Sequence, residues 1–246
     1  MVEIDDNLVL QDNKTKYSNE EMKKRCNGIY NRFIKRLLGV VIAFILIILL
    51  SPALLMISIA IMIDSGLPVF YSADRGGYKE KAFKIYKFRT MVNDADKIGG
   101  GTTALNDRRI TNIGHVLRKT KLDEIPQLLN IMKGEMSFIG PRPELLQYTS
   151  QYEDQEKFIL KVRPGVSDFS SIEFINLDEI VKGENADEMY EKYVLKRKNQ
   201  LRMKYVAQVS FAVDCKLFFV TVIKTVQKAI KTILRLDTKY GKNYSQ

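Results

Sequence analysis

Two adjacent carboxylates, Asp123 and Glu124, follow directly on a cluster of basic residues. Apolar side chains then recur at helical spacing, and Pro126 is tolerated only in a first helical turn, so the pattern predicts a helix over about 122–133. A helix N-terminus favours anions, so a carboxylate held there stays ionised, as a nucleophile must. One carboxylate could attack phosphorus while the other holds Mg²⁺, which takes one or two carboxylates together with substrate phosphates. Ordinary helix capping also explains the two acids.

A second candidate for phosphate chemistry is Arg142, which lies between two prolines, Pro141 and Pro143. Each proline fixes its own φ, and the residue before a proline is pushed out of the helical region. The backbone around Arg142 is therefore expected to be extended and stiff. A guanidinium held this way suits bidentate phosphate binding, although a rigid turn with an exposed arginine fits the same residues.

A β-hairpin and another rigid turn carry further basic residues. Runs rich in β-formers at 68–73 and 82–88, around a Gly-Gly pair, predict the hairpin, with Arg75 at its turn and Arg89 just after it. Arg163 precedes a proline in an Arg-Pro-Gly turn. Arg75 and Arg89 could face substrate phosphate or lipid headgroups, and each also fits a solvated basic strand. Arg163 is a further candidate for binding phosphate.

One long apolar segment must place these residues relative to a membrane. Leu37 to Ile63 is 27 residues without a charge, and at ~1.5 Å per residue such a helix exceeds the ~30 Å of a bilayer core. Basic residues flank both of its ends, whereas a spanning helix favours one side. Ser51-Pro52 near its centre predicts a kink. From these residues alone, a spanning helix and a re-entrant hairpin are equally supported.

Four runs of residues, in their order, closely resemble the bacterial sugar transferases, which are monotopic polyprenol-phosphate phosphoglycosyltransferases. The runs are K-F-R-T-M (87–91), D-R-R-I-T-N-I-G-H-V-L-R-K (107–119), L-D-E-I-P-Q-L-L-N (122–130) and G-E-M-S-F-I-G-P-R-P-E (134–144). The resemblance is strong over about residues 31–170 and weak over 171–230.

The resemblance implies a covalent, two-step reaction. Asp123 is the implied nucleophile: it attacks the β-phosphate of a UDP-sugar, releases UMP and becomes an aspartyl-phosphosugar, which passes to polyprenyl (undecaprenyl) phosphate. Mg²⁺ is the implied cofactor, with Glu124 as its ligand, and Arg118 and Arg142 are the implied contacts to phosphates and nucleotide. The product would open the synthesis of a surface glycan such as capsule, exopolysaccharide, O-antigen or glycoprotein.

The resemblance also favours the re-entrant reading of the apolar segment. A Lys-Arg entry and a central Ser-Pro are hallmarks of the family, and Lys35-Arg36 and Ser51-Pro52 match them. The implied location is the bacterial inner membrane, with the catalytic domain on its cytoplasmic face.

The chain departs from the family pattern in places. The family often continues Pro-Gly-Ile-Thr-Gly and then Gln, whereas Ser167 to Glu173 here read S-D-F-S-S-I-E, a change that bears on which sugar is accepted. Ala73 stands where family members often carry Gln. Gly99 to Gly101 predict a flexible connection, without the lysine of a P-loop. Asp107-Arg108 reads as an ion pair or a turn.

Composition narrows the class of partner. The net charge of +10 and pI near 9.4 imply an acidic partner. We expect UDP-sugar, polyprenyl phosphate and anionic lipids as partners and no nucleic acid, because the basic residues flank a membrane segment; a homodimer is compatible with the sequence. Two distant cysteines read as free thiols, and a single histidine cannot build a zinc site. The N-terminal residues lack the pattern of a signal peptide.

The sequence thus predicts a mostly helical α+β protein with a re-entrant helix hairpin, a short β-hairpin and interfacial amphipathic helices. We expect a variable polar segment at 1–30, the membrane helix at 31–66, the catalytic domain at 67–206 and an amphipathic surface helix with a tail at 207–246. The alternative is a non-catalytic membrane adaptor, which explains the charge but not the convergence of Asp-Glu, Pro-Arg-Pro and a cationic cluster.

Overall fold

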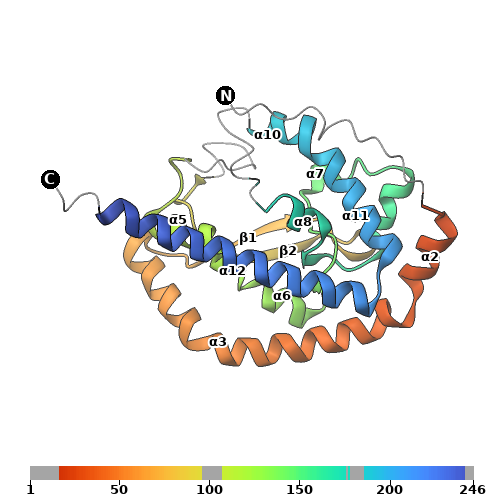
Figure 1. Cartoon of the computed structure of the whole chain (residues 1–246), viewed down its shortest axis with the longest axis horizontal. Helices are drawn as coiled ribbons and strands as arrows, with labels where there is room; N and C mark the ends of the chain where they lie inside the picture. Colours follow the sequence, from red (N-terminus) through yellow and green to blue (C-terminus); the bar gives the residue numbers. More distant parts are fainter. Residues whose placement is uncertain (1–16, 96–106, 176, 178–185, 242–246) are drawn as a thin grey trace.

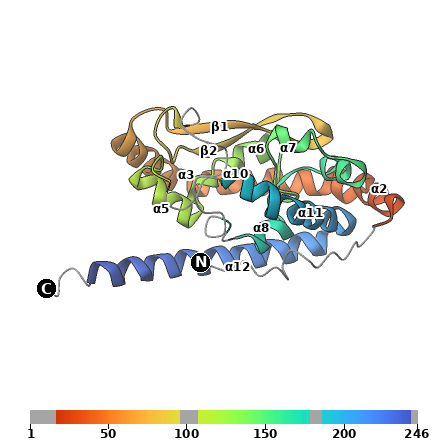
Figure 2. The same cartoon turned by 90° about the horizontal axis from the view of Figure 1, so that it is seen from above.

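The computed structural model describes residues 17–95, 107–175, 177 and 186–241. Two long helices, α3 (Lys35–Ser65) and α12 (Phe211–Gly241), run along a smaller body that contains the strands and the short helices (Figure 1). Viewed from above, α12 lies along one side of this body and the strands β1 and β2 lie on the opposite side (Figure 2). The expected mostly helical α+β class is confirmed.

The apolar segment forms one continuous helix. A π-helical turn, Tyr30–Ile34, leads into α3, and the helix passes through Pro52 without interruption. It bends along its length (Figure 1). Proline lacks the N–H that would pair with the carbonyl of Ile48, and the Ser51 hydroxyl donates to that carbonyl at 2.8 Å. The expected break at Ser51-Pro52 is therefore a bend in an unbroken helix, with the freed carbonyl satisfied locally.

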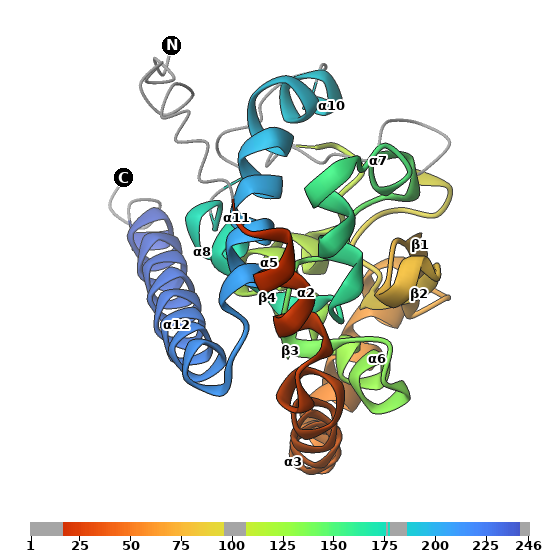
Figure 3. The same ribbon diagram turned by 90° about the vertical axis from the view of Figure 1, so that its right-hand side faces the viewer.

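Both ends of α3 are tied to the same body. Near its N-terminus the Lys35 ammonium forms an ion pair with Asp214 at 2.9 Å. At its C-terminus Arg89 donates to the Ser65 carbonyl at 2.8 Å, and the Asp64 carboxylate accepts from the Ile113 N–H at 3.1 Å. Figure 3 shows α3 passing beneath the body, with α2 (Asn19–Asn27) leading into it.

Helix α3 leaves a long apolar face uncovered. Ala43 and Ile61 are buried against the body, on the side where α3 meets α6 (Gln127–Lys133) and α5 (Asn112–Thr120). The large apolar residues that remain exposed are Leu37, Leu38, Val41, Ile42, Phe44, Ile45, Ile48, Leu49, Leu55, Met56, Ile59, Met62 and Ile63. By length and composition the helix over Tyr30–Ser65 could cross a membrane.

The strands form two small sheets. Strands β1 (Phe70–Arg75) and β2 (Phe83–Phe88) pair antiparallel, so the expected hairpin is confirmed. Strands β3 (Ser137–Ile139) and β4 (Gly165–Ser167) form a parallel pair that the sequence did not suggest. Parallel pairs need a long crossover connection, so their partners are distant in sequence.

Short helices complete the body between these strands. The residues after Pro143 form two separate pieces, α7 (Leu146–Thr149) and a 3₁₀ helix (Asp154–Lys161). Residues 186–208 form a continuous helical run. The remaining elements are the 3₁₀ turns Tyr78–Glu80 and Leu122–Glu124, α8 (Phe169–Glu173), α10 (Ala186–Met189), a π-helical segment (Tyr190–Leu195) and α11 (Lys196–Gln208).

Helix α12 begins within the segment 207–246, where the amphipathic pattern predicts a helix. Leu217 and Asp214 are buried against the body. The exposed apolar residues of its described part are Phe211, Phe218, Phe219, Val222, Ile223, Val226 and Ile230, which recur at helical spacing. The Gly99–Gly101 segment and residues 1–16 lie outside the described residues.

Candidate active site

The carboxylate pair lies on a tight turn between two helices. Helix α5 ends where Lys121 adopts a left-handed conformation, with φ of 62°. Asp123 and Glu124 follow on a single 3₁₀ turn, and α6 starts only after Pro126, at Gln127. The expectation that α6 begins near 122 is therefore wrong by about one turn, because the proline is the N-cap of α6 and does not lie inside it.

The two cations nearest to Glu124 are Arg142 and Lys87. One guanidinium nitrogen of Arg142 donates to Oε2 at 3.0 Å, the other forms a closer bond to Oε1, and the Lys87 ammonium donates to Oε1 at 3.2 Å. Burial opposes ionisation, but Arg142 and Lys87 together outweigh it and hold the pKa of Glu124 well below its usual range. Glu124 is therefore the carboxylate of the pair that stays charged.

Asp123 has a different environment from its neighbour. It is buried, its Oδ2 lies 4.0 Å from the Lys87 ammonium, and its Oδ1 has no hydrogen-bond partner among the described residues. Burial raises the pKa of Asp123, and Lys87, Lys121 and Arg118 offset part of that rise. A buried carboxylate oxygen without a donor is poorly stabilised as an anion, which makes it a reactive group for bonding to an electrophile.

Arg142 reaches the pair from the end of β3. Its Nη1 donates to the Val166 carbonyl at 2.8 Å as well as to Glu124. Pro141 and Pro143 flank it as the sequence indicates, and the Glu144 carbonyl accepts from the Gly76 N–H at 3.0 Å. Arg142 was expected as a phosphate contact; in the structure its guanidinium pairs with Glu124, as the planar fork of arginine allows.

Arg118 and Arg75 also lie near the site. The Arg118 Nε donates to the Thr90 hydroxyl at 2.8 Å, and Arg118 is close enough to Asp123 to lower the pKa of that carboxyl. Burial lowers the pKa of Arg75, and the charge of Arg142 lowers it further, against the opposing effect of Glu144. Arg118 thus acts on Asp123, and Arg75 lies near Arg142.

Arg89 and Arg163 lie apart from the carboxylates, at helix ends. Arg89 donates to the carbonyls of Ser65 and Gly66, at the end of α3. Arg163 donates to the Gly134 carbonyl at 3.1 Å, at the end of α6, and also to the Asn31 carbonyl. Both therefore act as ties between elements, and substrate contact by either residue stays a prediction.

Lys35 and Arg36, at the start of α3, and Asp107, before α5, also have defined partners. Lys35 is buried on Asp214 and donates to the Tyr205 hydroxyl. The Arg36 guanidinium lies against Gly134. Of the two alternatives for Asp107-Arg108, the structure shows the turn: the Ile110 N–H donates to the Asp107 carbonyl at 3.1 Å. The Asp107 carboxylate pairs with Arg109, at 2.7 Å, and not with Arg108.

Sequence reasoning missed Lys87 as an individual site residue, and it did not single out Gln127, which is buried shortly after the carboxylate pair. The basic run at 84–89 offers several candidates, and Lys87 is selected because the hairpin packs β2 against the 3₁₀ turn of the carboxylates. Gln127 follows Asp123 by one helical turn and is fully buried, and its amide atoms have no partner among the described residues. The Asp-Glu-Ile-Pro-Gln spacing was the available signal for Gln127.

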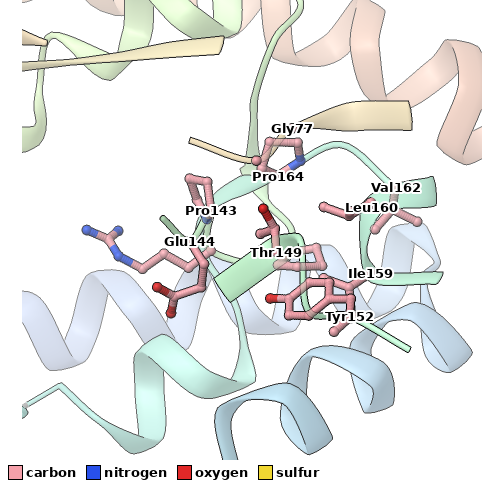
Figure 4. A pocket seen from close by; sticks show the side chains of 12 residues that line it. Gly77, Pro143, Glu144, Thr149, Tyr152, Ile159, Leu160, Val162 and Pro164 are labelled. Atoms are coloured by element: carbon pink, nitrogen blue, oxygen red, sulfur yellow. The ribbon is translucent and has the colours of Figure 1, made fainter. Parts of the chain in front are cut away.

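The loop of Arg142 is braced on its other side by Glu144. The carboxylate of Glu144 accepts hydrogen bonds from Arg202 and from the Tyr190 hydroxyl. Burial opposes its ionisation, but Arg202 and Lys198 outweigh this and lower the pKa of Glu144. Figure 4 shows Glu144 lining a small pocket together with Pro143, Thr149 and Tyr152.

The site offers few ligands for a metal ion. Within the part of the chain that the structure describes, no cluster of three or more His, Cys, Asp or Glu residues could hold one. The adjacent carboxylates of Asp123 and Glu124 do match the protein's share of a Mg²⁺ site, because this ion keeps waters and substrate phosphates as its other ligands. The unpartnered Oδ1 of Asp123 is a further acceptor available to a cation.

The sequence model of one protein family, described as bacterial sugar transferase, matches residues 30–228. The chain belongs to the bacterial sugar transferase family. The match begins at the π-helical turn before α3 and ends within α12, so it includes every residue of the site described above. The bent apolar helix and the carboxylate turn are therefore both within the family region.

Curated relatives of this bacterial sugar transferase come from several bacteria. The UDP-glucose:undecaprenyl-phosphate glucose-1-phosphate transferase of Escherichia coli K12 is 35% identical over 198 residues, which are 79% of this chain and 40% of that protein. The UDP-N-acetylgalactosamine-undecaprenyl-phosphate N-acetylgalactosaminephosphotransferase of Aeromonas hydrophila is 38% identical over 143 residues, 57% of this chain and 34% of that protein. An uncharacterized sugar transferase of Bacillus subtilis 168, EpsL, is 33% identical over 193 residues, 78% of this chain and 87% of that protein. The chain thus spans less than half of the first two relatives.

Proposed function

We propose that this protein transfers a phosphosugar from a UDP-sugar to polyprenyl (undecaprenyl) phosphate, with release of UMP. The observation that carries the proposal is the asymmetry of the carboxylate pair. Glu124 is bonded to two cations, whereas the buried Asp123 beside it keeps an oxygen without a partner among the described residues. The printed names of the Escherichia coli and Aeromonas relatives, which act on UDP-sugars and undecaprenyl phosphate, agree with this reaction.

The proposed reaction has two displacement steps at one phosphorus atom. In the first, Oδ1 of Asp123 bonds to the β-phosphorus of the donor, the bond from that phosphorus to the bridging oxygen breaks, and UMP leaves with that oxygen. In the second, an oxygen of polyprenyl phosphate bonds to the same phosphorus and the acyl-phosphate bond to Asp123 breaks. The carboxylate is regenerated, and the lipid carries a sugar diphosphate.

The basic residues around the pair would stabilise the charge that moves in both steps. The Lys87 ammonium lies 4.0 Å from Asp123 and 3.2 Å from Glu124. It can therefore stabilise the negative charge on Asp123 and then the charge that develops on the phosphoryl oxygens. Arg118 approaches the same turn from α5 and can contact the leaving nucleotide phosphate. Arg142 holds Glu124 and sets the direction in which that carboxylate points.

Mg²⁺ is part of the proposal, with Glu124 as its ligand together with phosphate oxygens of the donor. When bound, the ion would act as a Lewis acid on the phosphoryl group. Lys87 and Arg142 already bond to the Glu124 oxygens, so a cation at Glu124 must share them or displace one partner. In either arrangement Oδ1 of Asp123 is left for the attack on phosphorus.

We also propose that α3 enters and leaves the membrane on one face, the cytoplasmic face of the bacterial inner membrane. Support comes from its two ends, which are both bonded to the same body, at Lys35 with Asp214 and at Ser65 with Arg89. The bend of α3, which contains Pro52, and the uncovered apolar faces of α3 and α12 suit burial in one leaflet and contact with its lipids. A soluble nucleotide sugar and a lipid phosphate could then meet at the carboxylate turn.

Intact mass measurement of the detergent-solubilised protein tests the nucleophile. With Mg²⁺ and a panel of UDP-sugars, and without lipid acceptor, we expect a phosphosugar adduct on Asp123 and an equal amount of UMP. The Asp123→Asn variant keeps the shape of the side chain but not its charge, so it should form no adduct. The matched control is Asp187→Asn, which removes a carboxylate at the start of α10.

Two results would contradict the proposal in different ways. UMP release by Asp123→Asn at the wild-type rate would exclude Asp123 as nucleophile. No UMP from any donor, even after polyprenyl phosphate is added, would exclude the transferase reaction and favour a membrane adaptor.

A further inference from the structure

Asp168 lies where the ends of β3 and β4 meet. These strands are parallel, with Ile139 beside Ser167, so the residues that follow each strand emerge at the same edge. Arg142 follows β3, and Asp168 is the first residue after β4. Asp168 is completely buried. A residue at this edge is therefore in direct reach of the loop that carries Arg142.

The two carboxylate oxygens of Asp168 have separate partners. Oδ1 accepts from the Ser171 N–H at 2.7 Å, from the Ser170 hydroxyl at 2.7 Å and from the Ser171 hydroxyl at 2.8 Å, which caps α8. Oδ2 accepts from the Arg142 N–H at 3.4 Å. One side chain thus joins the start of α8 to the backbone of Arg142.

The same edge holds Arg142 by further bonds. The Gly140 N–H donates to the Ser167 carbonyl at 2.9 Å, and the Gly165 N–H donates to the Pro141 carbonyl at 3.1 Å. An added Cβ at Gly165 would lie 2.1 Å from the Gly140 nitrogen, so the close approach of the strands needs glycine there. The backbone before Arg142 is fixed by these bonds, and Asp168 supplies the next one along the chain.

The carboxylate of Asp168 also acts electrostatically on two nearby cations, Arg142 and Lys198. Burial lowers the pKa of Arg142, but Glu124 and, more weakly, Asp123 and Asp168 raise it above its usual value. Lys198 experiences the same carboxylate: its pKa is lowered to about 8, mainly by burial, while Glu144 and Asp168 oppose that change. Asp168 therefore favours the charged state of the arginine that bonds Glu124.

We propose that Asp168 is a positioning residue for Arg142: by accepting from its backbone N–H, it aims the guanidinium at Glu124 and couples the segment from Ser167 to Glu173 to the carboxylate site. The catalytic consequence rests on the proposed function, whereas the positioning does not. The sequence departs from the family pattern in this segment. Through Asp168, a change in the segment can alter the active site without any contact between the segment and the donor sugar.

Amide hydrogen exchange resolved to single residues tests the positioning. Asp168→Asn keeps the shape of the side chain but cannot present acceptors to both Ser171 and Arg142, because one of its two terminal atoms is a donor. We expect the Arg142 amide to exchange about fivefold faster, the factor for losing one hydrogen bond of average strength, because the bond at 3.4 Å is long for one to a charged group. The amides of Gly140 and Gly165, which bond to carbonyls, should keep their wild-type rates.

Two control variants separate positioning from loss of the helix cap. Ser170→Ala removes only a bond to Oδ1, so the Arg142 amide should exchange as in the wild type. Asp168→Ser can still cap α8 but is too short to reach Arg142. If Asp168→Asn does not fold, Asp168→Ser takes its place, and the Arg142 amide should again exchange faster than in the wild type. Unchanged exchange at Arg142, or equal acceleration at Gly140 and Gly165, would overturn the proposal.

Steady-state kinetics tests the catalytic consequence on the same variants. We expect kcat/KM for the UDP-sugar, measured as UMP release, to fall about tenfold in Asp168→Asn and less than twofold in Ser170→Ala. Wild-type kcat/KM in Asp168→Asn would show that the position of Arg142 does not limit the reaction. If the wild-type protein releases no UMP from any donor, the proposed function fails, and the exchange rates still decide whether Asp168 positions Arg142.

Discussion

At the scale of single residues, two neighbours of one chemical type have different environments. Asp123 and Glu124 are adjacent carboxylates, yet only Glu124 is bonded directly by Arg142 and Lys87. Direct bonds to cations favour the charged form more than a cation at 4.0 Å does. Glu124 is consequently the permanent anion, and Asp123 is the group whose charge depends on pH and on its neighbours.

The pH dependence of UMP release should reflect this difference. Burial raises the pKa of Asp123, and the nucleophile must be ionised, so the rate should fall as the pH decreases through a value above that of an ordinary aspartate. Lys87 offsets part of the rise, so Lys87→Met should move the acidic limb to still higher pH. Rates of the first turnover across pH, without lipid acceptor, measure the limb.

Lys84→Met is the matched control for that experiment. It removes a lysine from the same strand, but Lys84 is exposed and lies 3.9 Å from Asp74. The acidic limb should stay at its wild-type position. A limb that shifts equally in both variants, or in neither, would contradict the role assigned to Lys87.

At the scale of elements, α5 places Arg118 by packing its backbone directly against the Thr90 backbone. A Cβ added to Gly114 would lie 2.1 Å from the Thr90 carbonyl oxygen, far inside normal contact. Thr90 also accepts from the Arg118 Nε, so the same contact sets the position of that arginine. The absence of a side chain at Gly114 thus decides how near α5 lies to the carboxylate turn.

Substitution of Gly114 by alanine should therefore affect both stability and activity. The overlap is with backbone atoms and cannot be relieved by a rotamer change, so we expect a loss of about 2 kcal/mol or more in unfolding free energy. UMP release should also decrease because Arg118 moves with α5. Thermal unfolding in detergent and a UMP assay on the folded fraction provide the measurement.

Gly39→Ala is the comparison variant. A Cβ at Gly39 would lie 3.5 Å from the Ile131 side chain, which is ordinary contact, and alanine favours a helix. Its stability should equal or exceed that of the wild type. A Gly114→Ala protein as stable and active as Gly39→Ala would show that α5 has room to move.

At the scale of the whole molecule, α3 is a bent helix whose two ends return to one body. Lys35 is held by Asp214 from α12, and Ser65 is held by Arg89 after β2. These contacts join the beginning, middle and end of the chain. The proposed one-sided insertion therefore places α2, before the helix, and β1, after it, on the same side of the membrane.

Labelling of single cysteines measures this topology. We expect cysteines introduced at Glu20 and at Ser72, which are exposed on α2 and β1, to react with a membrane-impermeant maleimide only from the cytoplasmic side. The native cysteines, Cys26 and Cys215, are replaced by alanine in this experiment. Labelling of the two positions from opposite sides would mean that α3 spans the bilayer.

The local parts of the structure followed from the sequence alone. Helical spacing, the positions of proline and the β-rich runs determined the apolar helix, the β1–β2 hairpin and the amphipathic α12, because these depend on periodicity and on backbone restrictions within a few residues. The nearness of Arg142 to the Asp-Glu pair was not visible in that way. It was expected from the resemblance to the family.

Only the tertiary structure decided which basic residues surround the carboxylates. Lys87 and not Arg89 faces the pair, and Asp168 reaches the backbone of Arg142. Arg163 ties the end of α6 to the π-helical turn that precedes α3. These choices depend on the parallel pairing of β3 with β4 and on the packing of β2 against the 3₁₀ turn. Such contacts join residues far apart in the chain, and no local spacing encodes them, because the free energy that selects them comes from packing the whole body.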